Sequence, residues 1–179
     1  HHEIYNGFYQ LAGASGSNLL LEYRYRDSEQ GDLVQTFDSL FVPTESRTLE
    51  QSLTRLNTYL SFSNSQHMLF TGAYVDLDHS LLEEIPPEPP FFPGLNISIL
   101  GNEKTMDIQG QYIFDANKLN ILAGVGYFEI EGESDSIFDY GFGPLPDPTE
   151  YYRDRQSNLY SYLNLSFTPN VVATLGIAY

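Results

Sequence analysis

The chain has 179 residues, which is long enough for one domain with its own core, and its 24 acidic and eight basic residues give a formal net charge of −16. So few and scattered cations argue against a basic surface that neutralises a nucleic-acid backbone, and we expect no nucleic-acid partner. The absence of cysteine excludes a disulfide framework and thiolate metal sites. No apolar run approaches the roughly 18 residues of a membrane-spanning helix, but membrane-spanning strands are shorter and only half apolar.

The first predicted elements are two strands joined by a short turn. Alternation of two residue classes over Ile4–Leu11 predicts the first strand, and a run of small residues over 12–18 predicts the turn. A second strand follows over Leu19–Arg26. The segment 27–50 is long, polar and rich in acids, and we expect a loop there.

The next two strands repeat this arrangement. Alternation predicts strands over 55–62 and 69–78, with a turn over 63–67. A second long loop is expected over 79–104. Its stretch IPPEPPFFPG favours an extended chain that cannot take part in a sheet ladder, because proline has no N–H to donate.

The clearest pattern lies between residues 106 and 127 and predicts a hairpin. Apolar and polar residues alternate over Met106–Phe114, the chain turns at Asp115–Lys118, and the alternation resumes over Leu119–Tyr127. A period of two predicts strands with one apolar face and one polar or small face. About ten alternating residues per strand, with tight turns on one side and long loops on the other, are typical of transmembrane β-barrels.

A last pair of strands follows a third long loop, expected over 128–155. Alternation predicts strands over 158–167 and 171–179, joined by a turn at Thr168–Asn170. About eight strands in this order predict an all-β fold, an antiparallel up-and-down meander. We expect one outer-membrane domain over 1–179, either a transmembrane β-barrel or part of a larger one.

The positions of the acidic residues indicate the expected orientation of the strands across the membrane. Those outside the three long loops and the strand ends that lead into them are Glu3, Glu22, Asp107 and Asp115. With the acidic loops at the cell surface, the first strand runs inward and the last runs outward, so both ends lie outside. Complete bacterial barrels keep both ends in the periplasm, so we expect a fragment of a longer barrel. The alternation ending at Tyr179 resembles the C-terminal assembly signal of complete barrels, but this strand runs the opposite way.

The polar faces of the predicted strands supply the candidate site. In a barrel such a face lines the lumen and sets solute selectivity, whereas in a small barrel it only hydrates or fills the interior. The candidate lumen-lining residues are Glu22, Arg24, Arg26, Arg55, Asn57, Tyr59, Asp76, Asp78, Asp107, Gln109, Gln111, Tyr160, Tyr162 and Asn164.

Two acidic groups have ligand types that suit an ion. Asp76, Asp78 and His79 are expected at a strand end, where a solvated barrel rim is favoured over a metal or acid–base site. The five acids of 129–139 lack the spacing of a calcium loop, and a solvated outer loop is favoured there. We expect no cofactor, with Ca²⁺ or Mg²⁺ at the acidic outer loops as the alternative. Only four histidines are present, two of them at the start of the chain, and we expect no enzyme.

The stretches IYNGFYQLAG, EYRYRDSEQGDL, NILAGVGYFEIEG, NLYSYLNLSFTPNV and ATLGIAY resemble a proteobacterial family that joins periplasmic tetratricopeptide repeats to a C-terminal outer-membrane β-barrel. The resemblance spans most of the chain and falls inside the barrel of that family. It implies membrane transport or export, including export of a surface polymer. It also implies further barrel strands and a periplasmic repeat domain as partners, and it carries over no catalytic residues.

The expected function is therefore passage or export of polar solutes or surface polymer through a polar lumen, in contact with outer-membrane lipid and lipopolysaccharide. The acidic outer loops would favour cations near the mouth. Two alternatives stay open. One is a small closed eight-stranded barrel with a structural or adhesive role. The other is a soluble lipocalin-like protein that turns its apolar residues inward around a ligand, namely Leu19, Leu21, Ile121 and Leu163.

Overall fold

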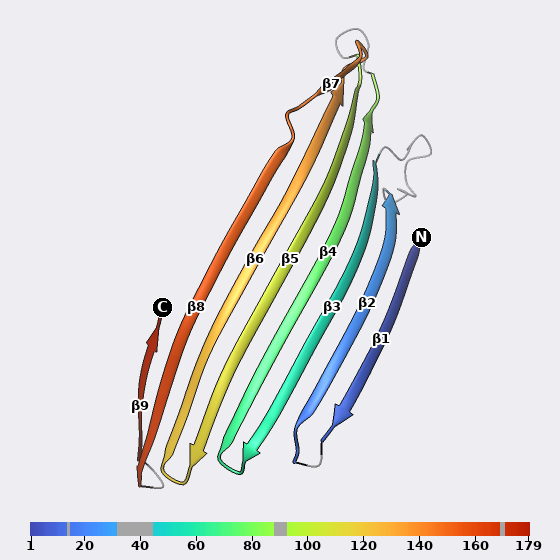
Figure 1. Cartoon of the computed structure of the whole chain (residues 1–179). Coiled ribbons are helices and arrows are strands. Elements are labelled where there is room, and N and C mark those ends of the chain that lie inside the picture. Colours follow the sequence, from blue (N-terminus) through green and yellow to red (C-terminus); the bar gives the residue numbers. More distant parts are fainter. Residues whose placement is uncertain (14, 32–44, 88–92, 169–170) are drawn as a thin grey trace, which may run out of the picture.

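The computed structural model describes residues 1–13, 15–31, 45–87, 93–168 and 171–179. In these ranges all regular structure is strand, and no helix is long and apolar enough to cross a membrane. The strands form one antiparallel sheet (Figure 1). They are β1 (His2–Ala12), β2 (Asn18–Gly31), β3 (Glu45–Ser63), β4 (Gln66–Ile85), β5 (Leu95–Ala116), β6 (Leu119–Asp139), β7 (Pro144–Pro146), β8 (Glu150–Thr168) and β9 (Val171–Ala178).

The topology is the predicted up-and-down meander. The order in the sheet is β1-β2-β3-β4-β5-β6-β8-β9, and every neighbouring pair is antiparallel. The three-residue β7 pairs with the end of β6 and raises the number of strands to nine. Its two prolines are tolerated because it is a short edge strand. The all-β antiparallel fold class is confirmed.

The strands are longer than the sequence pattern predicts. β3, β4, β5, β6 and β8 have 19 to 22 residues, roughly twice the 9–11 that a tilted strand needs to cross a membrane. Most of the described residues of the predicted loops over 27–50, 79–104 and 128–155 are therefore strand, and those loop boundaries are wrong. Strand pairing continues there because two neighbouring strands satisfy each backbone group, whatever the polarity of the side chains.

The short turns lie together at one end of the sheet, the lower end in Figure 1. Residues 64–65 and 117–118 form tight turns, and Gly16 takes a positive φ of 82° in the turn between β1 and β2. In the proline stretch, residues 86–87 and 93–94 belong to no strand. The rest of that stretch, 88–92, and the predicted turn residues 169–170 lie outside the described residues.

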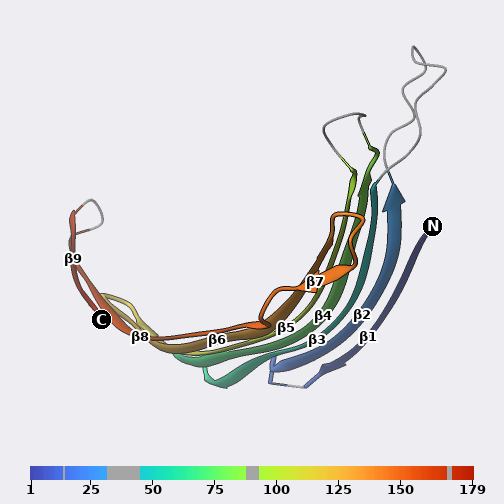
Figure 2. The ribbon, with the colours of Figure 1, turned by 90° about the horizontal axis from the view of Figure 1, so that it is seen from above.

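The sheet is curved but not closed. Figure 2 shows an arc with β1 at one end and β9 at the other. Hydrogen bonding runs from β1 to β9 without a β1–β9 pair among the described residues. The small closed eight-stranded barrel is therefore not the arrangement observed.

The sheet has no buried hydrophobic core among its described residues. Large apolar side chains are instead exposed, including Val125 at 56%, Leu159 at 61% and Leu175 at 65%. Because exposed apolar patches on water-soluble monomers rarely exceed a few hundred Å², this surface requires a partner other than water. A soluble lipocalin-like protein would shelter these side chains, and this sheet does not.

The strand register places the apolar side chains on one face. We call this the apolar face, and its residues in the lower half of the sheet are Leu19, Leu21, Tyr23, Leu56, Leu60, Met68, Phe70, Tyr74, Met106, Ile108, Tyr112, Ile121, Val125, Tyr127, Leu159, Leu163, Leu175 and Ile177. On β6 this band runs from Leu119 to Tyr127, which matches the length of a membrane-crossing strand. Tyr23, Tyr74 and Tyr127 border it on the upper side, as interface aromatics do in outer-membrane barrels.

The opposite, polar face is the crowded one. A Cβ at Gly124 would lie 2.3 Å from Cζ of Tyr160, and one at Gly126 would lie 2.6 Å from Oδ1 of Asn158. On the apolar face, a Cβ at Gly110 would meet nothing closer than 3.9 Å. Side chains converge on the inner side of a curved sheet and diverge on its outer side. We infer that the polar face is the concave face of the arc.

One glycine on this face tests the crowding directly. A Cβ at Gly132 would lie 2.5 Å from Cζ of Tyr152 and 2.8 Å from the backbone oxygen of Asn102. The tyrosine ring can turn away, but the backbone oxygen is fixed by the sheet. We expect Gly132→Ala to lower the free energy of unfolding by about 1–3 kcal/mol, the usual cost of overpacking.

Gly110→Ala is the matched control, because it makes the same change in a strand interior with open space around it. Urea unfolding of the full-length protein in detergent measures both. Equal midpoints for the two variants would contradict the crowded polar face.

Candidate solute-facing surface

The register brings most of the predicted lumen-lining residues onto the polar face. Glu22 pairs with Arg55, Arg55 with Ala73, and Ala73 with Asp107, so these side chains share one face across four strands. The residues that lie on this face are Glu22, Arg24, Arg26, Arg55, Asn57, Tyr59, Asp107, Gln109, Gln111, Tyr160, Tyr162 and Asn164. Their role as a lumen lining stays a prediction.

Asp76 and Asp78 do not share this face. Asp76 pairs with Ser52 and Asp78 with Glu50, which places both on the opposite face. There both carboxylates accept hydrogen bonds from the amide of Asn102, at 3.4 and 2.7 Å. Grouping these two residues with the other candidates on one face is therefore wrong. The pattern of β4 misleads because its alternate residues are apolar on both faces, so only the pairing with β3 and β5 decides which face each set takes.

The structure also does not bring together Asp76, Asp78 and His79, which were predicted to meet at a strand end. These residues lie within β4, which continues to Ile85. His79 is on the polar face, opposite Leu49 and Gly101, while the two aspartates point the other way. No three His, Asp or Glu side chains among the described residues are grouped so as to hold a metal ion.

The β5, β6 and β8 part of the polar face is rich in amides and tyrosine rings. The amide of Asn164 donates to Asn120 at 3.2 Å and accepts from the Thr174 hydroxyl at 2.8 Å. The rings of Tyr160 and Tyr162 lie with centroids 5.9 Å apart. Such groups can form hydrogen bonds with a polar solute, and because they are uncharged no ion has to lose its water when the solute binds.

Several residues of this face were not among the predicted ones. Register adds Glu103, Thr105, Tyr152, Asp154, Gln156 and Asn158. Glu103, Tyr152 and Asp154 lie in the segments expected as loops, and Thr105 and Gln156 lie directly beside those segments. The alternation of Tyr152, Asp154, Gln156 and Asn158 with the intervening residues continues the pattern of β8, and extending that period toward Glu150 would have found them.

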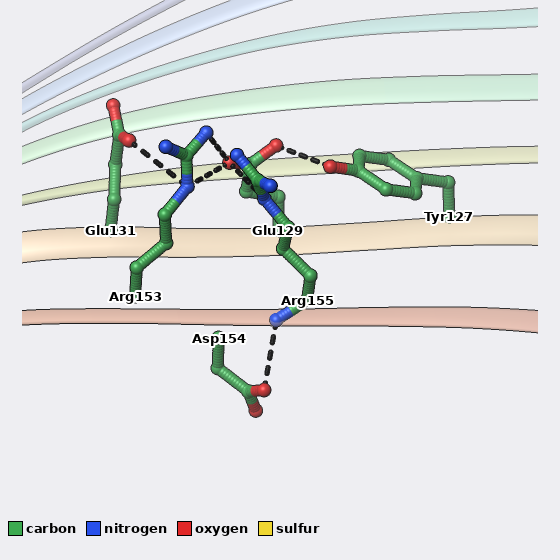
Figure 3. Close-up of polar contacts among 6 residues, drawn as sticks. All are labelled: Tyr127, Glu129, Glu131, Arg153, Asp154 and Arg155. Carbon is green, nitrogen blue, oxygen red and sulfur yellow. Dashed lines mark hydrogen bonds and ion pairs between the residues drawn. The ribbon is translucent and has the colours of Figure 1, made fainter.

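The acidic run of 129–139 lies in strand β6 and not in a loop, which corrects the sequence prediction. Its first acid, Glu129, is on the same face as the apolar band, just above Tyr127. Figure 3 shows Arg153 and Arg155 of β8 reaching Glu129 from one side and the Tyr127 hydroxyl reaching it from the other. Nε of Arg153 lies 2.5 Å and Nε of Arg155 3.0 Å from Oε1 of Glu129. Arg153 also lies 3.7 Å from Glu131.

This cluster holds Glu129 ionised. Hydrogen bonds from the Tyr127 hydroxyl and then from the two guanidinium groups lower the pKa of Glu129 to about 2. The same carboxylate raises the pKa of Arg153. Because two arginines of β8 meet a carboxylate of β6, the cluster ties these strands together above the apolar band. Because Glu129 and Glu131 are already paired with arginine, this part of the acidic run is a poorer cation site than the sequence alone suggests.

Acid should weaken this cluster. The pKa of Glu129 is lower in the folded protein than in the unfolded chain, so its stabilising contribution is complete above about pH 5 and is lost as the pH falls toward 2. We expect Glu129→Gln to reduce the slope of the free energy of unfolding against pH in this window. The reduction should correspond to about one proton fewer taken up on unfolding. Urea unfolding of the full-length protein between pH 2 and 6 measures the slope.

Glu131→Gln is the matched control, since within the described part of the chain Glu131 makes only the longer contact with Arg153. It should leave the slope close to that of the unaltered protein. A slope that Glu131→Gln changes as much as Glu129→Gln would contradict the assignment.

Comparison with known proteins agrees with the fold. Neither a scan against protein-family models nor a search of curated proteins gives a match, so the expected link to the tetratricopeptide family has no support there. The ferric yersiniabactin uptake receptor FyuA from Yersinia pestis superposes with a TM-score of 0.63 at 14% identity, over 89% of this chain. The outer membrane protease OmpT from Escherichia coli gives a TM-score of 0.35 at 10% identity, over 90% of this chain and 64% of OmpT.

The chain spans 24% of the length of FyuA. The TM-score with OmpT is too low to carry an argument, and the likeness to FyuA concerns the fold alone. FyuA is an outer-membrane β-barrel protein. The sheet of this chain is thus an antiparallel meander of the kind that forms the wall of an outer-membrane β-barrel.

Proposed function

We propose that this chain forms a section of the wall of a wide β-barrel in the bacterial outer membrane, and that its polar face lines a path for polar solutes. The observation that carries the proposal is the absence of a buried core together with an exposed apolar band on one face. Lipid is the surrounding in which such a band is stable, and the opposite face is then the lumen.

The arc supports a wide barrel. The eight strands of the meander curve without bringing β1 and β9 together (Figure 2). They superpose on a section of the receptor FyuA, with a TM-score of 0.63. A barrel of about eight strands has an interior just filled by side chains, whereas wider barrels enclose a channel or a plugged lumen. A wide lumen gives the amides, tyrosines and charges of the polar face access to water and solute.

The class of solute follows from the polar face and from the family resemblance. Amide, hydroxyl and charged side chains can form hydrogen bonds with a polar solute. This favours passage or export of such a solute, as in a porin or an exporter. Export of a surface polymer and a periplasmic repeat domain rest on the resemblance alone. The upper, charged part of the apolar face would contact the lipopolysaccharide headgroups, with Ca²⁺ or Mg²⁺ bridging those acids that form no ion pair with another described residue. Nothing in the polar face calls for covalent chemistry, and we propose no enzymatic role.

Cysteine labelling at adjacent residues tests this assignment. Ile108 and Gln109 follow one another on β5 and lie on opposite faces, and the chain has no native cysteine to interfere. We expect Gln109→Cys in the full-length protein to react with a charged, membrane-impermeant maleimide at least about tenfold faster than Ile108→Cys, since lipid excludes the reagent. Membrane vesicles that carry each variant are the sample.

Two controls make the comparison sharp. Both variants should react equally after denaturation, and Tyr162→Cys and Leu163→Cys on β8 should repeat the contrast. Fast labelling of Ile108→Cys would contradict the lipid-facing band. Absence of labelling at both Gln109→Cys and Tyr162→Cys would contradict a solute path on the polar face.

A further inference from the structure

The chain is strongly acidic, yet one part of the polar face is positive. Arg24 and Arg26 of β2 and Arg55 of β3 all lie on this face, and we call them the arginine patch. Arg24 pairs with Leu53 and Arg26 with Gln51, while Arg55 pairs with Glu22. Three of the eight basic residues are therefore collected over two adjacent strands.

One carboxylate is shared among these arginines. Glu22 lies 3.2 Å from Arg24 and 3.4 Å from Arg55, and its side chain is 20% exposed. Arg24 also donates to the side-chain oxygen of Asn6 at 3.1 Å. Arg26 makes no hydrogen bond or ion pair with another described residue, and it is exposed. Three guanidinium groups against one carboxylate leave two positive charges.

The neighbouring strands do not neutralise the patch. On the β1 side, the polar face presents Ile4, Asn6 and Phe8. On the β4 side it presents Ala73, Val75 and Leu77. The next acids on this face, Glu103 and Asp107, lie on β5, two strands from β3 and thus roughly 10 Å away. Within the described residues the patch is separated from those acids by an apolar strip.

We propose that the arginine patch binds an anionic group of the solute, a carboxylate or a phosphate. This proposal rests on the proposed function, because it requires the polar face to be open to solute. Guanidinium groups bind carboxylate and phosphate through paired hydrogen bonds, and Arg24 and Arg55 are 50% and 43% exposed, so both can reach a ligand. The site selects anions at the inner wall, although the chain as a whole carries a net charge of −16.

Pyrophosphate is a suitable probe because it offers several phosphate oxygens without a particular solute structure. Titration calorimetry of the full-length protein in detergent should detect binding that weakens as salt rises, since salt screens exposed charges. We expect Arg24→Gln with Arg26→Gln to weaken binding at least about tenfold. Arg24→Lys with Arg26→Lys should keep part of it, because lysine keeps the charge but loses the paired geometry.

The matched control is Arg153→Gln with Arg155→Gln, which removes two arginines that lie two residues apart on one strand, β8, on the opposite face. It should leave binding unchanged. Absence of binding by the unaltered protein, or equal loss in both double variants, would overturn the site. Binding with the expected variant pattern but no ionic conductance in a planar bilayer would keep the site and count against solute passage, so the two failures can be told apart.

Discussion

Apolar side chains that find no protein partner impose the main constraint on this molecule. Eight strands pair edge to edge in one antiparallel ladder, and neighbouring strands satisfy one another's backbone groups. The sheet nevertheless packs against no second layer, and no hydrophobic residue among those described is buried. Folding therefore gives hydrogen bonds without a core. The hydrophobic contribution has to come from the surrounding medium, and in the proposed barrel wall a lipid bilayer would supply it along one face.

This constraint explains why the strands change character along their length. Near the tight turns the two faces differ sharply, as the proposed function requires of a wall with lipid on one side and water on the other. Farther up, both faces carry charge, as Glu129 and Arg153 on one side and Glu103 and Asp154 on the other illustrate. The ladder continues through this region, and cross-strand pairs such as Glu129 with Arg155 join strands where lipid no longer contributes.

Sequence reasoning succeeded where one side of a strand is apolar and the other is not. The hairpin of 106–127 has this property, and its register in the structure pairs Gln111 with Gly124 and Ile108 with Tyr127. It failed for β4, since Leu69 and Val75 on one face are as apolar as Phe70 and Tyr74 on the other. Asp76 and Asp78 were misplaced for that reason. The extent of the strands was also missed, because polar residues on both faces of an extended strand resemble a loop.

Contacts between residues that are far apart in the chain could not be predicted from this one sequence. Strand pairing brings Arg153 to Glu129 and Arg55 to Glu22, and no local sequence pattern predicts either contact. The curvature of the arc is likewise a property of the whole sheet. The alternation of polar residues could therefore be predicted from the sequence. The structure was needed to show which of these residues share a face, and which arginines have too few carboxylates beside them to neutralise their charge.

The central claim is that this sheet is one section of a wide barrel whose apolar face meets lipid. Cryo-electron microscopy of the full-length protein in a lipid nanodisc tests it most directly. The claim predicts that β1 and β9 each pair with a strand other than one another, and that the lipid density surrounds the face bearing Ile108 and Val125. Direct pairing of β1 with β9 in a small closed barrel, or lipid density against the face bearing Gln109 and Arg24, would contradict it.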